Sequence, residues 1–172
     1  ADIKTMSALG VYAASAITAI TVQNTKGVYG IQNVEPEIVK GQIEAVMEDI
    51  HPDAIKIGMV NDCDTIRAIA ETLKKYQESF QHLVIDPVMV STSGCRLMQE
   101  DALQVFRTEL MPLASLLTPN VPEAEILSGI KIETVDDMDR AANKICREAG
   151  CAVLVKGGHL DGQKTDRLYT PH

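Results

Sequence analysis

The sequence lacks an excess of basic residues. Its 172 residues contain 16 Lys and Arg against 24 Asp and Glu, which gives a net charge of −8 and a pI near 4.9. Proteins that bind nucleic acid electrostatically need clustered Lys and Arg to displace counterions from phosphates. The composition therefore argues against a nucleic-acid partner, but it is compatible with a single phosphorylated small molecule, which needs only local positive groups.

Zinc-site cysteine spacing and long apolar runs are also missing. The cysteines at 63, 95, 146 and 151 show neither C-x-x-C spacing nor His partners at zinc-site intervals, so reduced thiols are the simplest interpretation. No apolar run approaches the roughly 20 residues that a membrane helix needs. The apolar-rich stretch 6–19 is interrupted by polar residues and has no basic flank of a signal peptide. We expect a cytoplasmic protein without a membrane partner.

Conventional phosphate loops are absent as well. The sequence contains neither G-x-x-x-x-G-K followed by Ser or Thr nor G-x-G-x-x-G, so a nucleotide would need another cradle. It contains no internal repeat, low-complexity tract or linker. With 45% hydrophobic and 23% charged residues, 1–172 is expected to form a single globular domain with a substantial core.

Apolar runs alternate with amphipathic helical patterns along the chain. The runs, rich in Val, Ile and Leu, cover residues 16–22, 54–57, 83–85, 116–117 and 153–155. Helical stripes cover 38–50, 66–73, 103–110 and 135–145, and Thr134 with Asp137 resembles a capping box before the last stripe. Strands that are apolar throughout are typical of a sheet covered on both faces. The pattern predicts a parallel α/β layer sandwich, and residues 29–34 predict an extra strand in a lid or edge hairpin.

Polar residues or glycines follow each apolar run. Ligands of open parallel α/β sheets gather at the carboxyl ends of the strands, so these residues are expected to share one rim. The segments concerned are 23–25, 58–59, 86–89, 118–120 and 156–159. An acid, two amide clusters and a lysine on one rim predict a site for a small molecule and a phosphate.

Asn120 and Glu123 stand at the start of the expected helix after residues 116–117. An amide oxygen and a carboxylate at this spacing suit a hydrated Mg²⁺ beside a phosphate, because Mg²⁺ prefers hard oxygen ligands and keeps several waters. The same residues, with Pro122, also suit a helix cap, an early proline and a partner for the helix dipole. The motif alone does not decide between the two interpretations.

Asp86 and Lys156 each allow a functional and a structural interpretation. Asp86 directly follows an apolar run and could orient magnesium-bound water, or simply form a turn with Pro87. Lys156 could pair with a phosphate as a point charge while Gly157 and Gly158 let backbone N–H groups approach it, or it could be a solvated lysine before a glycine turn.

Several segments together resemble a known family. The matching segments are 1–5, 22–28, 55–59, 86–89, 117–124 and 155–159. In this order, over essentially the whole chain, they resemble the hydroxymethylpyrimidine and phosphomethylpyrimidine kinases of thiamine biosynthesis, within the ribokinase-like superfamily. Six matching segments are far more specific than any one of them.

The resemblance implies a ribokinase-like fold, which is a three-layer α/β/α sandwich with a mostly parallel central sheet. It also implies a homodimer, and ATP with Mg²⁺ for phosphorylation of a hydroxymethylpyrimidine substrate. It implies three groups of site residues on matching positions. The pyrimidine pocket would be lined by Asp2, Gln23, Met59 and Val88. Magnesium and its waters would be organised by Asp86, Asn120 and Glu123. Lys156 and Gly158 would lie near the nucleotide phosphates.

The chain departs from the family pattern at both ends. Family members begin with a strand and a glycine-rich Gly-Ser-Asp-Ser-Gly-Gly-Ala-Gly segment, and this chain starts inside that motif at Ala1. They also carry a later Gly-Thr-Gly-Cys stretch with the anion hole and the catalytic residue, which this sequence does not contain. We therefore expect a ribokinase-like domain truncated at both ends, inactive or nearly so as a 172-residue chain, because phosphoryl transfer depends on such electrostatic stabilisation.

Two alternatives stay open. A pyridoxal kinase of similar architecture would also phosphorylate a hydroxymethyl group on a six-membered heteroaromatic ring, and Gln23 and Met59 favour the pyrimidine only weakly. A noncatalytic pyrimidine-binding module would account for the missing glycine-rich ends.

Overall fold

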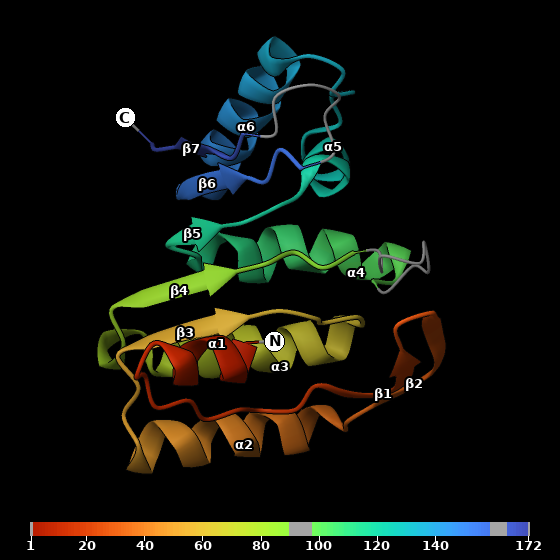
Figure 1. Ribbon diagram of the computed structural model, residues 1–172. Helices are drawn as coiled ribbons and strands as arrows, with labels where there is room; N and C mark the ends of the chain where they lie inside the picture. The colour runs from red at the N-terminus through yellow and green to blue at the C-terminus, as the bar shows by residue number, and fades with distance from the viewer. Residues whose placement is uncertain (1, 90–97, 159–164, 172) are drawn as a thin grey trace.

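A five-stranded sheet forms the centre of the molecule (Figure 1). The computed structural model describes residues 2–89, 98–158 and 165–171. The strands are β3 (Ala54–Ile57), β4 (His82–Ile85), β5 (Leu116–Leu117), β6 (Ala152–Val155) and β7 (Arg167–Tyr169), paired in that order. β3 to β6 are parallel, whereas β7 pairs antiparallel with β6. The predicted mostly parallel sheet is therefore confirmed. The edge strand β7 was not predicted from the sequence.

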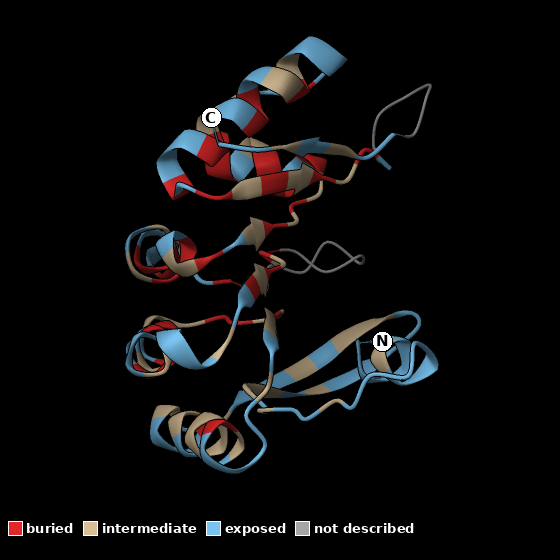
Figure 2. Cartoon of the chain, turned by 90° about the vertical axis from the view of Figure 1, so that its left-hand side faces the viewer, coloured by how far each residue is buried: buried red, intermediate tan, exposed pale blue. Residues whose placement is uncertain are grey.

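Helices cover the sheet and complete the layers (Figures 1 and 2). The longer ones are α2 (Pro36–Asp49), α3 (Cys63–Lys75), α5 (Val121–Ser128) and α6 (Val135–Ala149). The shorter ones are α1 (Asp2–Ala8), η1 (Gln77–Ser79), and α4 (Glu100–Val105), which continues through η2 (Phe106–Leu110) and η3 (Met111–Leu113). α2, α3 and α4 line one face of the sheet and α1 lies on the other side, so the expected layered α/β fold is confirmed (Figure 2).

The central strands are more deeply buried on one face than on the other. Leu83, Ile85, Leu117, Val153 and Val155 share one face and are each fully buried. Val84, Leu116 and Leu154, which point to the opposite face, are half-buried. The apolar runs at 83–85, 116–117 and 153–155 are therefore confirmed as strands, with their fully buried side chains on one face.

The run at 16–22 is not a strand of this sheet, and that prediction is wrong. Its residues contribute to β1 (Ala19–Asn24), which pairs antiparallel with β2 (Gly27–Asn33) in a separate two-stranded hairpin. Only residues 25 and 26 separate the two strands, and so short a connection permits antiparallel pairing but not the crossover that a parallel neighbour requires. The extra strand predicted at 29–34 is confirmed as β2.

Local capping signals determine where α6 begins. Thr134 Oγ1 accepts from the Asp137 N–H at 3.2 Å, and Asp137 Oδ2 accepts from the Thr134 N–H at 3.0 Å. This reciprocal pair is the predicted capping box, with the shorter Asp in place of Glu. At the other end Gly150 has a φ of 69°, a left-handed conformation that glycine adopts without a Cβ penalty.

Two valines test the different roles of the hairpin and the sheet. Val153 in β6 is fully buried, whereas Val22 in β1 is 64% exposed. Val153→Ala is expected to lower the free energy of unfolding by about 2–3 kcal/mol, because it removes two buried methyl groups and leaves a cavity. Val22→Ala, its matched control, is expected to cost less than about 1 kcal/mol. Urea unfolding of both variants measures the difference, and equal losses would contradict the assignment of β1 to an exposed hairpin.

Candidate functional site at the carboxyl edge of the sheet

Charged and polar side chains meet where β4, β5 and β6 end. Lys156, directly after β6, donates through Nζ to Asp86 Oδ1 at 2.8 Å, and Asp86 directly follows β4. Asn120 lies between them and forms a parallel β-bridge with Lys156. The Lys156 N–H donates to the Pro119 carbonyl at 2.9 Å, which extends the β5–β6 pairing by one step. The expected convergence on one rim is therefore found for these residues.

Asn120 and Glu123 form a complete capping box at the start of α5. Asn120 Oδ1 accepts from the Glu123 N–H at 2.9 Å, and Glu123 Oε2 accepts from the Asn120 N–H at 2.8 Å. Pro122 occupies the first turn, where a missing N–H costs nothing. The structural interpretation of this motif is thus confirmed. It does not exclude a second role, because carboxylate and amide oxygens each carry further lone pairs.

Burial makes Glu123 an unusual capping residue. Its side chain belongs to the core, with the residue only 3% exposed. Desolvation raises the pKa of the Glu123 carboxyl, and the hydrogen bond from the Asn120 backbone and the nearby charge of Lys156 oppose that rise. The carboxylate of Asp86 adds to the upward shift of the pKa. Glu123, Lys156 and Asp86 therefore interact electrostatically across the rim.

The donor set at the rim fits a hydrated divalent cation. Two carboxylates, Asp86 and Glu123, and the amide oxygen of Asn120 are hard ligands of the kind that Mg²⁺ selects. Within residues 2–89, 98–158 and 165–171, no three His, Cys, Asp or Glu residues group closely enough to hold a metal by themselves. Lys156 already pairs with one oxygen of Asp86. These residues therefore suit an ion that keeps much of its water, rather than one enclosed by protein ligands.

The glycines after Lys156 differ from each other in what they can contribute. The Gly157 N–H donates to Asp166 Oδ1 at 3.0 Å, so it is not free for a phosphate. A Cβ at Gly157 would lie 2.0 Å from the Thr165 carbonyl oxygen, which means that close packing requires glycine there. Gly158 is exposed, and a Cβ there would meet open space. His159 lies outside the described residues.

The expected pyrimidine-lining residues occupy four different segments of the chain. Asp2 belongs to α1, Met59 follows β3 and is half-buried, and Val88 follows the turn at Asp86. Gln23 is exposed near the end of β1, so the prediction that it ends a strand of the central sheet is wrong. The hairpin would have to bring Gln23 to the rim as a separate arm.

Lys56 is a further candidate residue, which sequence analysis did not single out. Its Nζ donates to Asp2 Oδ2 at 2.7 Å, and this hydrogen bond lowers the pKa of the Asp2 carboxyl despite partial desolvation. The pair joins α1 to β3 across 54 positions of sequence. The available signal was a lysine inside the apolar strand 54–57, where an unpaired charge would be costly.

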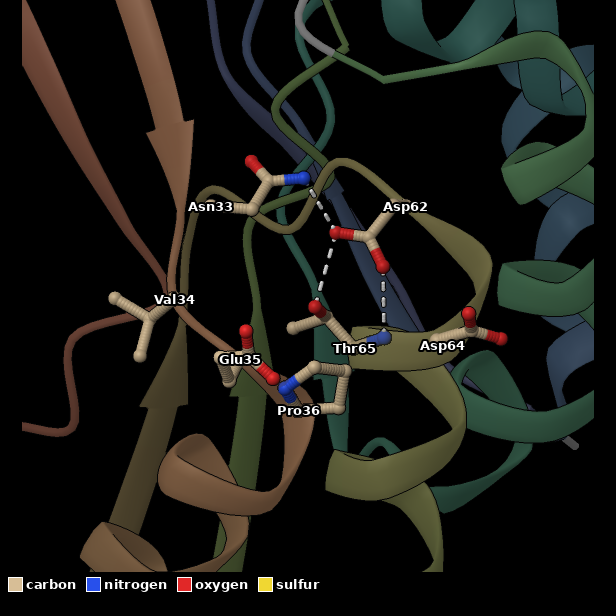
Figure 3. Close-up of a pocket in the computed structure, with 7 residues that line it drawn as sticks. All are labelled: Asn33, Val34, Glu35, Pro36, Asp62, Asp64 and Thr65. Atoms are coloured by element: carbon tan, nitrogen blue, oxygen red, sulfur yellow. Dashed lines mark hydrogen bonds between the residues drawn. The ribbon is translucent and has the colours of Figure 1, made fainter.

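A cavity of about 280 Å³ lies at the base of the hairpin (Figure 3). Its lining residues are Asn33, Val34, Glu35, Pro36, Asp62, Asp64 and Thr65. None of the predicted site residues lines it. Asp62 already accepts hydrogen bonds from Asn33 and Thr65 there, so the cavity is part of the junction between β2 and α3.

Free thiols and helix lengths agree with the expectations from composition. Cys63, Cys146 and Cys151 are free, and burial raises the pKa of Cys151 to about 11, so its thiol stays protonated. Cys95 lies outside the described residues. None of the helices in the described part of the chain has the length and apolarity required to cross a bilayer.

Replacing Glu123 distinguishes its charge from its capping role. The pKa of the Glu123 carboxyl is raised above 4.5 in the folded protein. At pH values between 4.5 and this raised pKa, the carboxyl is protonated in the folded state and ionised in the unfolded state. Its contribution to stability is therefore present below pH 4.5 and is lost as pH rises through the folded pKa. Glu123→Gln should keep the acceptor for the Asn120 N–H and remove this pH dependence.

The control for this prediction is Glu123→Ala, which removes both the charge and the acceptor. This variant should lower the free energy of unfolding by a further 1–3 kcal/mol, roughly, because the Asn120 N–H loses its acceptor and the truncated side chain leaves a cavity. Urea unfolding of the three proteins between pH 4 and 8 gives both comparisons. A difference between wild type and Glu123→Gln that does not change with pH would contradict the raised pKa.

The comparisons with known proteins agree on one family. The family model described as phosphomethylpyrimidine kinase matches residues 1–172. A hydroxymethylpyrimidine/phosphomethylpyrimidine kinase of Rhizobium meliloti is 49% identical over 170 residues, which covers 98% of this chain and 63% of the relative. The chain thus spans less than two thirds of that relative's length.

The similar solved structures include a phosphomethylpyrimidine kinase and a pyridoxal kinase. The crystal structure of phosphomethylpyrimidine kinase from Clostridium difficile 630 matches with a TM-score of 0.90 and 51% identity, over 98% of this chain and 72% of that one. Pyridoxal kinase from Staphylococcus aureus in complex with AMP-PCP and pyridoxal matches with a TM-score of 0.84 and 31% identity, over 98% of this chain and 61% of that one. The predicted ribokinase-like relationship is confirmed, and the chain belongs to the phosphomethylpyrimidine kinase family.

Proposed function

We propose that the protein carrying this chain uses ATP to phosphorylate 4-amino-5-hydroxymethyl-2-methylpyrimidine and its monophosphate in thiamine biosynthesis. The observation that carries the proposal is the Lys156–Asp86 pair beside the buried Glu123, because it gathers both signs of charge at one rim of the sheet. Membership of the phosphomethylpyrimidine kinase family supports the choice of substrate.

Different residues of the rim would contact the phosphates and the metal ion. Lys156 offers a point charge to a phosphate oxygen, and the exposed turn at Gly158 allows the nucleotide to approach closely. Asp86, Asn120 and Glu123 would hold Mg²⁺ through its waters. The bound ion supplies neutralising charge to the phosphate oxygens, which is the main electrostatic requirement of phosphoryl transfer.

The pyrimidine would lie against Asp2, Gln23, Met59 and Val88. The Asp2 carboxylate, held by Lys56, can accept a hydrogen bond from the amino group of the pyrimidine. The lowered pKa of Asp2 keeps this acceptor ionised at neutral pH. Met59 and Val88 offer apolar contacts, and Gln23 offers an amide to the ring nitrogens or the hydroxymethyl group.

We further propose a homodimer in the cytoplasm. Several large apolar side chains are exposed on α1, the hairpin and the chain between them, and a second copy could cover them (Figure 2). They are Ile3, Leu9, Val11, Tyr12, Ile17, Ile20, Val22, Tyr29 and Ile31. Light scattering of the 172-residue chain should then give about twice 18.7 kDa, and a concentration-independent mass of 18.7 kDa would exclude the dimer.

Pyridoxal phosphorylation is the second candidate, because the S. aureus pyridoxal kinase shares the fold. The full-length protein that carries this chain is assayed by ADP release with the pyrimidine, its monophosphate and pyridoxal as acceptors. The specificity constant kcat/KM decides between substrates, because discrimination occurs in the transition state. We expect the pyrimidine to be preferred at least tenfold over pyridoxal, and pyrimidine binding without any turnover would favour the noncatalytic alternative.

Lys156 provides the matching test of the phosphate site. Lys156→Met should weaken binding of a non-hydrolysable ATP analogue by about tenfold, because it removes one charge-assisted contact, while pyrimidine affinity stays unchanged. Lys156→Arg keeps the positive charge beside Asp86 and serves as the control. Calorimetric titration measures both ligands. Equal ATP affinity of the Met variant and wild type would remove Lys156 from the phosphate site.

A further inference from the structure

The β1–β2 hairpin depends on a few side chains at its base for its position. No residue of either strand is buried, so the hairpin has no core that could fix it against the sheet. Figure 2 shows it leaving the body of the molecule on the side opposite α2, α3 and α4. An arm of this kind needs specific contacts where it joins the body.

Two contacts tie the chain before β1 to the body. Thr18 Oγ1 donates to the Met59 carbonyl at 2.8 Å. The second contact is made by the side-chain amide of Gln42 in α2, which accepts from the Ile17 N–H at 2.9 Å and donates to the Ile17 carbonyl at 3.1 Å. The amide thus satisfies both backbone groups of Ile17, as the backbone of a paired strand does. These bonds hold the first strand of the arm at its root.

Asn33 provides the corresponding contact at the end of β2. Its Nδ2 donates to Asp62 Oδ2 at 2.8 Å (Figure 3). Its Oδ1 accepts from Asn61 Nδ2 at 2.6 Å. Asp62 can only accept as a carboxylate, so it determines which way the Asn33 amide is oriented. The amide therefore bridges two successive residues of the loop between β3 and α3.

Asp62 is itself rigidly held. It is the N-cap of α3, where Oδ1 accepts from the Thr65 N–H and Oδ2 from Thr65 Oγ1, both at 2.9 Å. The loop from Met59 to Asp62 thus ends on the first turn of a well-packed helix. Asn33 connects the arm that carries Gln23 to the same loop that carries Met59.

We propose that Asn33 is a positioning residue that fixes the distance between Gln23 and Met59 across the pyrimidine pocket. The inference rests on the proposed function, which places both residues at the substrate. A strand rises about 3.3 Å per residue, so Gln23 lies roughly 13 Å beyond Ala19, and a rotation of about 10° at the base moves it by roughly 2 Å. Donor–acceptor distances in hydrogen bonds span only about 2.7–3.2 Å, so a displacement of this size would break a hydrogen bond between Gln23 and the substrate.

The register of the hairpin supports this reading of Gln23. Val22 pairs with Gly30 but Gln23 pairs with Val28, so the strands contain a bulge next to Gln23. Bulges redirect side chains and are frequent beside active sites. The bulge orients Gln23 within the arm, and the Asn33 bridge orients the arm.

Binding and distance measurements test the proposal together. Asn33→Ala should weaken binding of 4-amino-5-hydroxymethyl-2-methylpyrimidine by about tenfold, as expected for loss of a hydrogen bond to a charged group, and leave binding of the ATP analogue unchanged. The matched control is Gln32→Ala, one residue earlier on β2 and equally exposed, which should affect neither ligand. Thermal unfolding of both variants confirms that they remain folded.

A spin-label distance between Lys26 in the hairpin turn and Lys74 on α3 reports the arm directly. Labels introduced through non-natural amino acids leave the native cysteines unchanged. The distance distribution should broaden in Asn33→Ala and not in Gln32→Ala. An unchanged distribution with unchanged pyrimidine affinity overturns the proposal.

Exchanging the side chains of Asn33 and Asp62 provides a rescue experiment. Asn33→Asp alone places two carboxylates against each other and should broaden the distribution. The double exchange Asn33→Asp with Asp62→Asn restores a donor opposite an acceptor and keeps a good N-cap on α3, so it should recover the narrow distribution and the affinity. If wild type does not bind the pyrimidine, the proposed function fails while the distance measurements still decide the role of Asn33.

Discussion

Parallel pairing of β4, β5 and β6 is the constraint on which the rim depends. β5 is only two residues long, yet it pairs with β4 on one side and with β6 on the other. The backbone continues this pairing beyond the strand, because Asn120 forms a bridge with Lys156 and the Lys156 N–H donates to Pro119. Parallel strands end on the same edge, so Asp86, Asn120 and Lys156 meet although they come from three different strands. The ion pair between Lys156 and Asp86 spans β5 as a result.

Glu123 combines a structural role in the fold with a place in the candidate site. As a member of the capping box it satisfies a backbone N–H that the first turn of α5 would otherwise leave unpaired. Its burial then makes the carboxylate sensitive to the charges of Lys156 and Asp86. The two hydrogen bonds of the capping box restrict the movement of the Glu123 carboxylate. Under the proposed function this restraint would help to position a hydrated cation, because its outer waters leave few direct bonds to define its place.

Features that depend on neighbouring residues could be predicted from the sequence, and features that depend on distant ones could not. The Thr134/Asp137 and Asn120/Glu123 boxes act over three positions, and the rim follows from a general property of parallel sheets. The strand at 16–22 was assigned to the wrong sheet because buried strands and exposed hairpins can have the same apolar composition. The two-residue turn at 25–26 was the sequence feature that excludes parallel pairing. The contacts Lys56–Asp2, Asn33–Asp62 and Gly157–Asp166 join polar residues without a local pattern. Only the folded chain brings them together.

The two halves of the candidate site differ in how they are held. The strand ends and the helix start that carry the residues proposed for the phosphates pack against buried core residues, which restricts their movement. Asp2 and Gln23, two of the four residues proposed for the pyrimidine, belong to α1 and the hairpin, neither of which has a buried residue. Elements without a core are fixed by single polar bridges, and each bridge contributes little stability but a definite geometry. Recognition of the pyrimidine is therefore expected to respond to changes at these bridges that leave the global stability of the chain, and its phosphate contacts, almost untouched.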